Sequence, residues 1–99
     1  MKKVYFTIAG MNHYYGTEVL KKGTKVKLIK EPDNEYDTEA IRVEHKGLGK
    51  IGYVANSTHT VLGESYSAGR IYDEFGKKAK GVIRVVTPKG VICELKGGK

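Results

Sequence analysis

Residues 28–57 read LIKEPDNEYDTEAIRVEHKGLGKIGYVANS, and this stretch decides the fold. Residues 40–44 alternate between apolar and polar side chains, and a glycine-bounded turn separates them from a second strand pattern at 50–54. Before them, Pro32 fixes its own φ, and the Asp and Asn that follow it favour turn conformations. The stretch therefore predicts a β-hairpin, joined by an acidic loop to a basic strand at 25–30.

Strand patterns dominate the rest of the chain as well. β-Branched and aromatic residues predict three further strands, at 4–9, 80–86 and 90–95. Apolar residues at helical spacing predict a helix of two to three turns within 56–75, with Ser67 as its N-cap and Gly76 after its end. One short helical turn is also expected at 17–22. Six short strands and one or two small helices predict a mainly β (β-rich α+β) fold, a small OB- or SH3-like barrel.

Length and composition indicate one soluble domain. The chain has 99 residues, of which 39% are hydrophobic and 29% charged, which suits a single core and is too polar for a membrane protein. We expect one domain over 1–96 and a flexible tail over 97–99. The apolar run after Lys2 and Lys3 is too short for a signal peptide, so a cytoplasmic location is expected. The lone Cys93 excludes an internal disulfide and is expected to be a small buried hydrophobe.

The charge of the chain falls into blocks. The formal net charge is +7, yet six of the eleven acidic residues lie between Glu31 and Glu44. An excess of lysine suits a polyanionic partner, and nucleic acid is the first candidate. Lys25 and Lys27 point to the same side of their predicted strand, where they form either a phosphate-facing stripe or an ordinary exposed face.

The acidic loop allows more than one interpretation. The plainest is a solvated connector that keeps the edge of a sheet soluble. The loop also imitates part of an EF-hand, because Asp33, Glu35 and Asp37 alternate and Glu44 is the twelfth residue counted from Asp33. Against calcium, Thr38 stands where that loop needs glycine, and the sequence predicts no flanking helices. The same three carboxylates would be the metal ligands of a nuclease.

A third interpretation comes from a resemblance to a known family. GMNHYYG at 10–16 is followed by the stretch at 28–57, which contains E-P-x-N-x-Y-D, x-A-I-x-V and a later G-Y step. This ordered set resembles the HIRAN domain over most of the chain, from residue 5 to about residue 86. HIRAN domains occur fused to helicases and nucleases of DNA repair and also as small free-standing bacterial proteins. The run THTVLGESYSAGRIYDEF is similar to that free-standing branch.

The resemblance implies an OB-like barrel that captures the 3′ end of single-stranded DNA. Seven positions correspond to binding positions of the family: His13, Tyr14, Asn34, Tyr36, Asp37, Tyr53 and Asn56. Tyr14 and Tyr36 would stack on unpaired bases, at roughly 1–3 kcal/mol per base. Asp37 would accept a hydrogen bond from a free 3′-hydroxyl and repel the phosphate that is present at any internal position.

Three of these positions depart from the family pattern. His13 replaces an arginine, Tyr53 replaces a histidine, and Asn56 replaces a lysine that binds phosphate. Two charge-assisted phosphate contacts are therefore missing. Lys50, Arg70 or the lysines around residue 78 are the candidates to replace them.

Ordinary structural roles also account for the same residues. Each tyrosine can be a half-buried core residue whose hydroxyl is hydrogen-bonded. Asp37 can cap a backbone amide near Ala40, as aspartates near strand starts often do. The other acids of the loop are expected to form turns and to keep the loop soluble.

Taken together, the residues and the resemblance predict a non-catalytic nucleic-acid-binding domain for single-stranded DNA or frayed 3′ ends. The sequence contains no P-loop and no nucleophile with an adjacent base, and no cofactor is expected. A helicase or nuclease is the implied protein partner, with no membrane association. Two alternatives stay open: a protein-interaction module of a DNA-repair complex, and a metal-dependent nuclease component.

Overall fold

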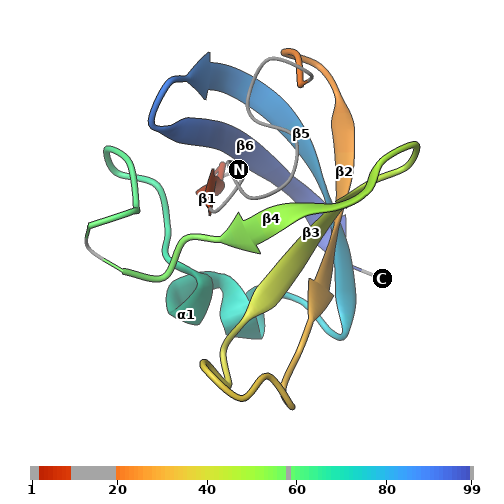
Figure 1. Ribbon diagram of the computed structural model, residues 1–99, viewed down its shortest axis with the longest axis vertical. Helices are drawn as coiled ribbons and strands as arrows, with labels where there is room; N and C mark the ends of the chain where they lie inside the picture. Colours follow the sequence, from red (N-terminus) through yellow and green to blue (C-terminus); the bar gives the residue numbers. More distant parts are fainter. Residues whose placement is uncertain (1–2, 10–19, 58, 99) are drawn as a thin grey trace.

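The computed structural model describes residues 3–9, 20–57 and 59–98. Within these residues, six strands close into an antiparallel barrel in the order β1-β4-β3-β2-β5-β6 (Figure 1). The elements are β1 (Tyr5–Ala9), β2 (Lys25–Lys30), β3 (Ile41–His45), β4 (Gly49–Val54), α1 (Ala68–Ile71), the 3-10 helix η3 (Tyr72–Glu74), β5 (Lys78–Thr87) and β6 (Gly90–Gly98). The predicted mainly β barrel of about six strands is confirmed.

Alternation of side chains sets the inside and outside of the barrel. Val26 and Leu28 of β2 are buried, whereas Lys25 and Lys27, which alternate with them, are exposed. Because successive side chains of a strand point to opposite faces, this pattern fixes the register of β2 against its neighbours. The hairpin predicted from residues 40–54 is present as β3 and β4, with an irregularity in register after Val43.

The C-terminal strand is longer than the sequence indicates. β6 continues to Gly98, and Gly97 and Gly98 pair with Lys80 and Ala79 of β5. Two of the three residues expected in a flexible tail therefore belong to the barrel. The paired strand contains Cys93, whose side chain is fully buried as expected. Burial raises the pKa of the Cys93 thiol to about 12.

The helical segment covers one end of the barrel core. The Ser67 hydroxyl accepts a hydrogen bond from the amide of Arg70 at 3.3 Å, which confirms Ser67 as the N-cap. The α-helix is a single turn followed by η3, shorter than the predicted two to three turns. Fully buried Ile71 anchors it to the core. Residues 20–22, the described part of the other expected helical turn, are not helical, and residues 17–19 lie outside the described part of the chain.

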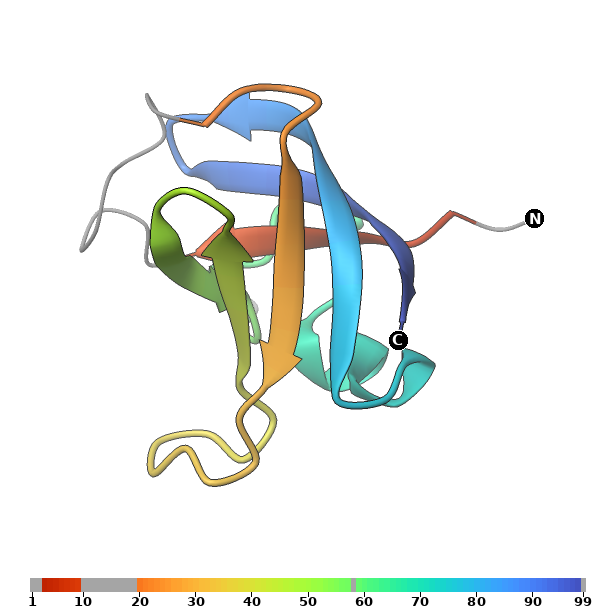
Figure 2. The same ribbon diagram turned by 90° about the vertical axis from the view of Figure 1, so that its right-hand side faces the viewer.

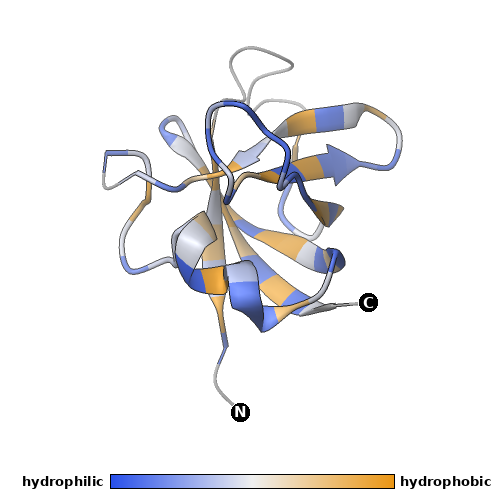
Figure 3. Ribbon diagram, turned by 90° about the horizontal axis from the view of Figure 1, so that it is seen from below, coloured by the Kyte–Doolittle hydropathy of each residue, from blue (hydrophilic) through white to orange (hydrophobic). Residues whose placement is uncertain are grey.

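The acidic loop and α1 lie at the same end of the molecule. Figure 2 shows the connection from β2 to β3 at the lower end, next to the helical segment. Figure 3 views that end and shows mostly hydrophilic residues along the loop. No helix among the described residues is long and apolar enough to cross a membrane.

Candidate nucleic-acid interface

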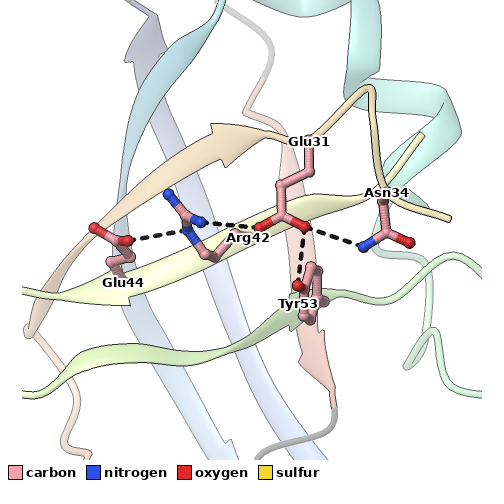
Figure 4. Close-up of polar contacts among 5 residues, drawn as sticks. All are labelled: Glu31, Asn34, Arg42, Glu44 and Tyr53. Atoms are coloured by element: carbon pink, nitrogen blue, oxygen red, sulfur yellow. Dashed lines mark hydrogen bonds and ion pairs between the residues drawn. The ribbon is translucent and has the colours of Figure 1, made fainter. Parts of the chain in front are cut away.

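Glu31 fastens the start of the acidic loop to the barrel (Figure 4). Its Oε1 accepts hydrogen bonds from Asn34 Nδ2 at 3.0 Å and from the Tyr53 hydroxyl at 2.9 Å. Its Oε2 lies 3.0 Å from Arg42 Nη1. Arg42 of β3 and Tyr53 of β4 are paired across the two strands, so one carboxylate joins the loop to both. Sequence reasoning expected Glu31 only to shape and solubilise the loop.

These contacts change the ionisation of both partners. Partial burial acts to raise the pKa of Glu31, but hydrogen bonds from Asn34 and Tyr53 and the positive charges of Arg42 and Lys50 outweigh it. The pKa of Glu31 is therefore below its ordinary value. Burial and the hydrogen bond to Glu31 raise the pKa of Tyr53. The pair consists of a carboxylate that accepts and a phenol that donates.

Asn34 shapes the part of the loop that follows. Its Oδ1 accepts hydrogen bonds from the backbone amides of Tyr36 at 2.9 Å and Asp37 at 3.1 Å. This is the local side-chain-to-backbone bonding by which asparagine stabilises turns. Beyond it, the ring of Tyr36 is 91% exposed. Tyr36 therefore does not have the half-buried core role, whereas Tyr53 is half-buried with its hydroxyl hydrogen-bonded.

Asp37 and Asn56 link the loop to α1. Asp37 Oδ1 accepts from the amide of Glu39 at 2.8 Å, and its Oδ2 accepts from Asn56 Nδ2 at 3.0 Å. Asn56 Oδ1 in turn accepts from the amide of Gly69 at 2.8 Å. A Cβ at Gly69 would lie 2.7 Å from Glu39 Oε1, so the loop approaches the helix where the side chain is absent. The expected capping role of Asp37 is present, and it uses part of the acceptor capacity of the carboxylate.

Three of the residues predicted for the site line one shallow hollow. Asp37, Tyr53 and Asn56 border a space of about 370 Å³, which we call the loop hollow. A second hollow, of about 420 Å³, shares Asn56 and Ser57 with it and is bordered by Arg70. The guanidinium carbon of Arg70 lies 4.0 Å from the centroid of the Tyr66 ring, which orients this cation.

The other predicted residues lie elsewhere or outside the described chain. His13 and Tyr14 belong to residues 10–19, which are outside the described part. Ala9, the last described residue before them, borders the loop hollow. Lys25 and Lys27 border a different hollow, on the outer face of the barrel. Among the described residues, no group of three or more His, Cys, Asp or Glu side chains is arranged to hold a metal ion.

The chain is similar to known proteins in sequence pattern and in fold. The family model of the HIRAN domain matches residues 1–90. A crystal structure of a Lactobacillus plantarum protein superposes with a TM-score of 0.63 at 22% identity, covering 95% of this chain and 93% of that one. The HIRAN domain of human HLTF superposes with a TM-score of 0.61 at 18% identity, covering 94% of this chain and 74% of that one. No curated protein sequence matches the chain.

These matches confirm the resemblance drawn from the sequence motifs. The two structural likenesses are too distant in sequence to carry more than the fold, whereas the family model spans most of the chain. The family match supports a nucleic-acid-binding domain in a family of binding domains. The chain belongs to the HIRAN domain family.

Proposed function

We propose that the protein binds single-stranded DNA or frayed 3′ ends and captures the terminal nucleotide at the loop hollow. The observation that carries the proposal is the shared lining of this hollow by Asp37, Tyr53 and Asn56. Tyr36 supports it, because a ring that is 91% exposed leaves both faces accessible to a base. Stacking of one base on such a ring contributes about 1–3 kcal/mol.

Asp37 is the group that distinguishes a strand end from a strand interior. An ionised carboxylate has about four acceptor positions, and the amide of Glu39 and Asn56 Nδ2 occupy two of them. The remaining positions suit a terminal 3′-hydroxyl, which is a donor. A phosphate at the same place is an anion and is repelled. The two hydrogen bonds also hold the carboxylate in one orientation, which favours selective binding.

Arg70 is a cation placed close enough to serve the neighbouring phosphate. Asn56 stands where the family has a phosphate-binding lysine, but its amide is engaged with Asp37 and with the amide of Gly69. Arg70 borders the adjoining hollow and is oriented by its contact with Tyr66. A guanidinium can form two parallel hydrogen bonds with a phosphate, so Arg70 can replace the missing lysine.

The test compares two ends of the same oligonucleotide. Fluorescence anisotropy is measured for single strands that carry either a 3′-hydroxyl or a 3′-phosphate, at two salt concentrations. We expect the 3′-phosphate to weaken binding by about 10- to 100-fold, the range of one hydrogen bond to a charged group. In Asp37→Asn this difference should disappear. Asp33→Asn, an exposed acid of the same loop, removes the same charge and should retain it.

Two results would contradict the proposal. The first is equal affinity of the unaltered protein for both ends, which would leave only general attraction between lysines and phosphates. The second is loss of discrimination in Asp33→Asn as well as in Asp37→Asn, because the effect would then follow loop charge and not the position of one carboxylate. Failure to bind any oligonucleotide would favour the protein-interaction alternative.

A further inference from the structure

Five lysines gather on the outer face of the barrel, away from the loop hollow. They come from four different places in the chain and border one hollow of about 390 Å³: Lys25 and Lys27 of β2, Lys46 after β3, Lys80 of β5 and Lys96 of β6. We call this surface the lysine face. The strands β2 and β5 that form its centre face the viewer in Figure 2.

In the described part of the chain, few of the positive charges of this face take part in ion pairs. Lys27 lies opposite Lys80 of β5 on one side and opposite Glu44 of β3 on the other. The like charges of Lys27 and Lys80 destabilise the sheet, and the pair with Glu44 offsets part of that effect. Among the described residues, Lys25, Lys27, Lys46 and Lys80 form no ion pair. The repulsion between Lys27 and Lys80 costs stability in the free protein, and an anionic partner would relieve it.

Nearby charges of either sign have other partners. Glu44 also borders the hollow, but its Oε2 lies 2.9 Å from Arg42 Nε. Lys30, the third lysine of β2, donates to the carbonyl of Phe75 at 2.8 Å and lies 4.2 Å from the centroid of the Tyr72 ring. Lys30 thus helps to attach the helical segment to β2, whereas the other two lysines of β2, earlier in the strand, belong to the lysine face.

We propose that the lysine face binds the phosphate backbone of duplex DNA without reading its sequence. Among the described residues that border the hollow, none is aromatic, so the face offers no platform for stacking unpaired bases. Single strands are bound by a basic groove combined with such stacking platforms, whereas a duplex keeps its bases stacked and presents phosphates. Lysines repeated along a strand and across neighbouring strands match a surface that carries one charge about every 1.7 Å along its axis.

The lysine face is independent of the capture of 3′ ends. In Figure 1, β2 and the lower part of β5 lie on the right-hand side, whereas β4 runs to the left toward the residues that border the loop hollow. One molecule can therefore hold a strand end on one side and a duplex on the other. The proposal does not rest on the role of Asp37.

The test uses a duplex that has no strand ends. Anisotropy is measured with a dumbbell duplex closed at both ends, over a range of salt concentrations. The triple variant Lys25→Gln, Lys27→Gln and Lys80→Gln should bind roughly tenfold or more weakly, and its slope of log K against log salt should be shallower by about 2.7. A matched control removes three exposed lysines from turns: Lys22→Gln, Lys77→Gln and Lys89→Gln.

The outcomes separate this proposal from the one for strand ends. The proposal is supported if the triple variant of the lysine face, called the face variant, still discriminates a 3′-hydroxyl from a 3′-phosphate. It also requires that Asp37→Asn still bind the closed duplex. Equal weakening by the control triple would overturn the proposal, since total charge alone would then explain binding. Unchanged duplex binding by the face variant would overturn it too, as would binding to vesicles of anionic lipid but not to the closed duplex.

A stability measurement checks the same surface without ligand. Removing one charge of the opposed pair in Lys80→Gln should raise the thermal midpoint of the free protein, because Lys27 and Lys80 repel each other across the strands. Addition of the closed duplex should then raise the midpoint of the unaltered protein more than that of the variant. A lower midpoint for free Lys80→Gln would contradict the repulsion on which the proposal depends.

Discussion

Replacing Glu31 by alanine should both destabilise the protein and weaken its choice of strand ends. The substitution removes three hydrogen bonds at 2.9–3.0 Å, from Asn34, Tyr53 and Arg42. A hydrogen bond contributes about 0.5–1.5 kcal/mol net, and more where one partner is charged. Because the carboxylate is partly exposed, we take about 1 kcal/mol for each bond, which gives a loss of about 2–4 kcal/mol.

The functional effect follows through Asn34. Without Glu31, the Asn34 amide loses the acceptor that holds it, and its Oδ1 no longer fixes the backbone of Tyr36 and Asp37. We therefore expect Glu31→Ala to reduce the difference in affinity between 3′-hydroxyl and 3′-phosphate strands, although Glu31 itself does not border the loop hollow.

Urea unfolding followed by circular dichroism measures the stability effect, and anisotropy measures the binding effect. Glu35→Ala is the matched control, because it removes an exposed acid of the same loop and should change stability by less than about 0.5 kcal/mol. A loss in Glu31→Ala as small as that of the control would refute the reasoning. The carboxylate would then be an ordinary surface acid, as the sequence suggested.

Three further predictions follow from single residues. Tyr36→Ala should weaken single-strand binding by about 1–3 kcal/mol while leaving the urea midpoint unchanged, because the ring is 91% exposed; unchanged affinity would remove it from the site. The pKa of Glu31 is lowered in the folded protein, so ionised Glu31 stabilises the fold fully above its ordinary pKa of 4.5, and this stabilisation is lost as the pH falls through the lowered pKa of the folded state. The thermal midpoint of the unaltered protein should therefore fall in acid, and that of Glu31→Gln should fall less. Native Cys93 should resist thiol reagents until the protein unfolds, because burial raises its pKa to about 12, and rapid labelling of the folded protein would contradict this.

The strands were predictable because their signals are local. Alternation in residues 25–30 and 40–54 reports directly which side chains face the core, and these strands lie within one or two residues of their predicted bounds. The length of the helix was overestimated because apolar spacing shows which face is buried and does not show where the helical conformation ends. The α-helical turn ends at Ile71, the chain tightens into η3, and Phe75 is extended. Closure between β1 and β6 joins distant parts of the chain, and no local pattern indicates it.

The site was predictable as a set of residues but not as an arrangement. The family motif indicated Asp37, Tyr53 and Asn56, which do share a hollow. The role of Glu31 was missed, although it is the first residue of the E-P-x-N-x-Y-D motif, because only the fold brings Arg42 and Tyr53 to it. Lys25 and Lys27 were predicted for the site but lie away from the loop hollow, and only the fold shows this. Alternation tells which side chains of a strand face outward, but not which side of the barrel the strand occupies.

The concentration of acids in one loop of a basic protein now has a physical explanation. Glu31, Asp37 and Glu39 accept hydrogen bonds from side chains of β3, from β4 and from Asn56 just after it, so much of the negative charge serves to attach the loop to the barrel. The lysines of the lysine face lie on a different side. A polyanion approaching this molecule is therefore drawn to the lysine face and repelled from the loop, unless it offers a hydroxyl where the next phosphate would be. Under both proposals, this polarity admits strand ends to the loop hollow and keeps continuous backbone on the lysine face.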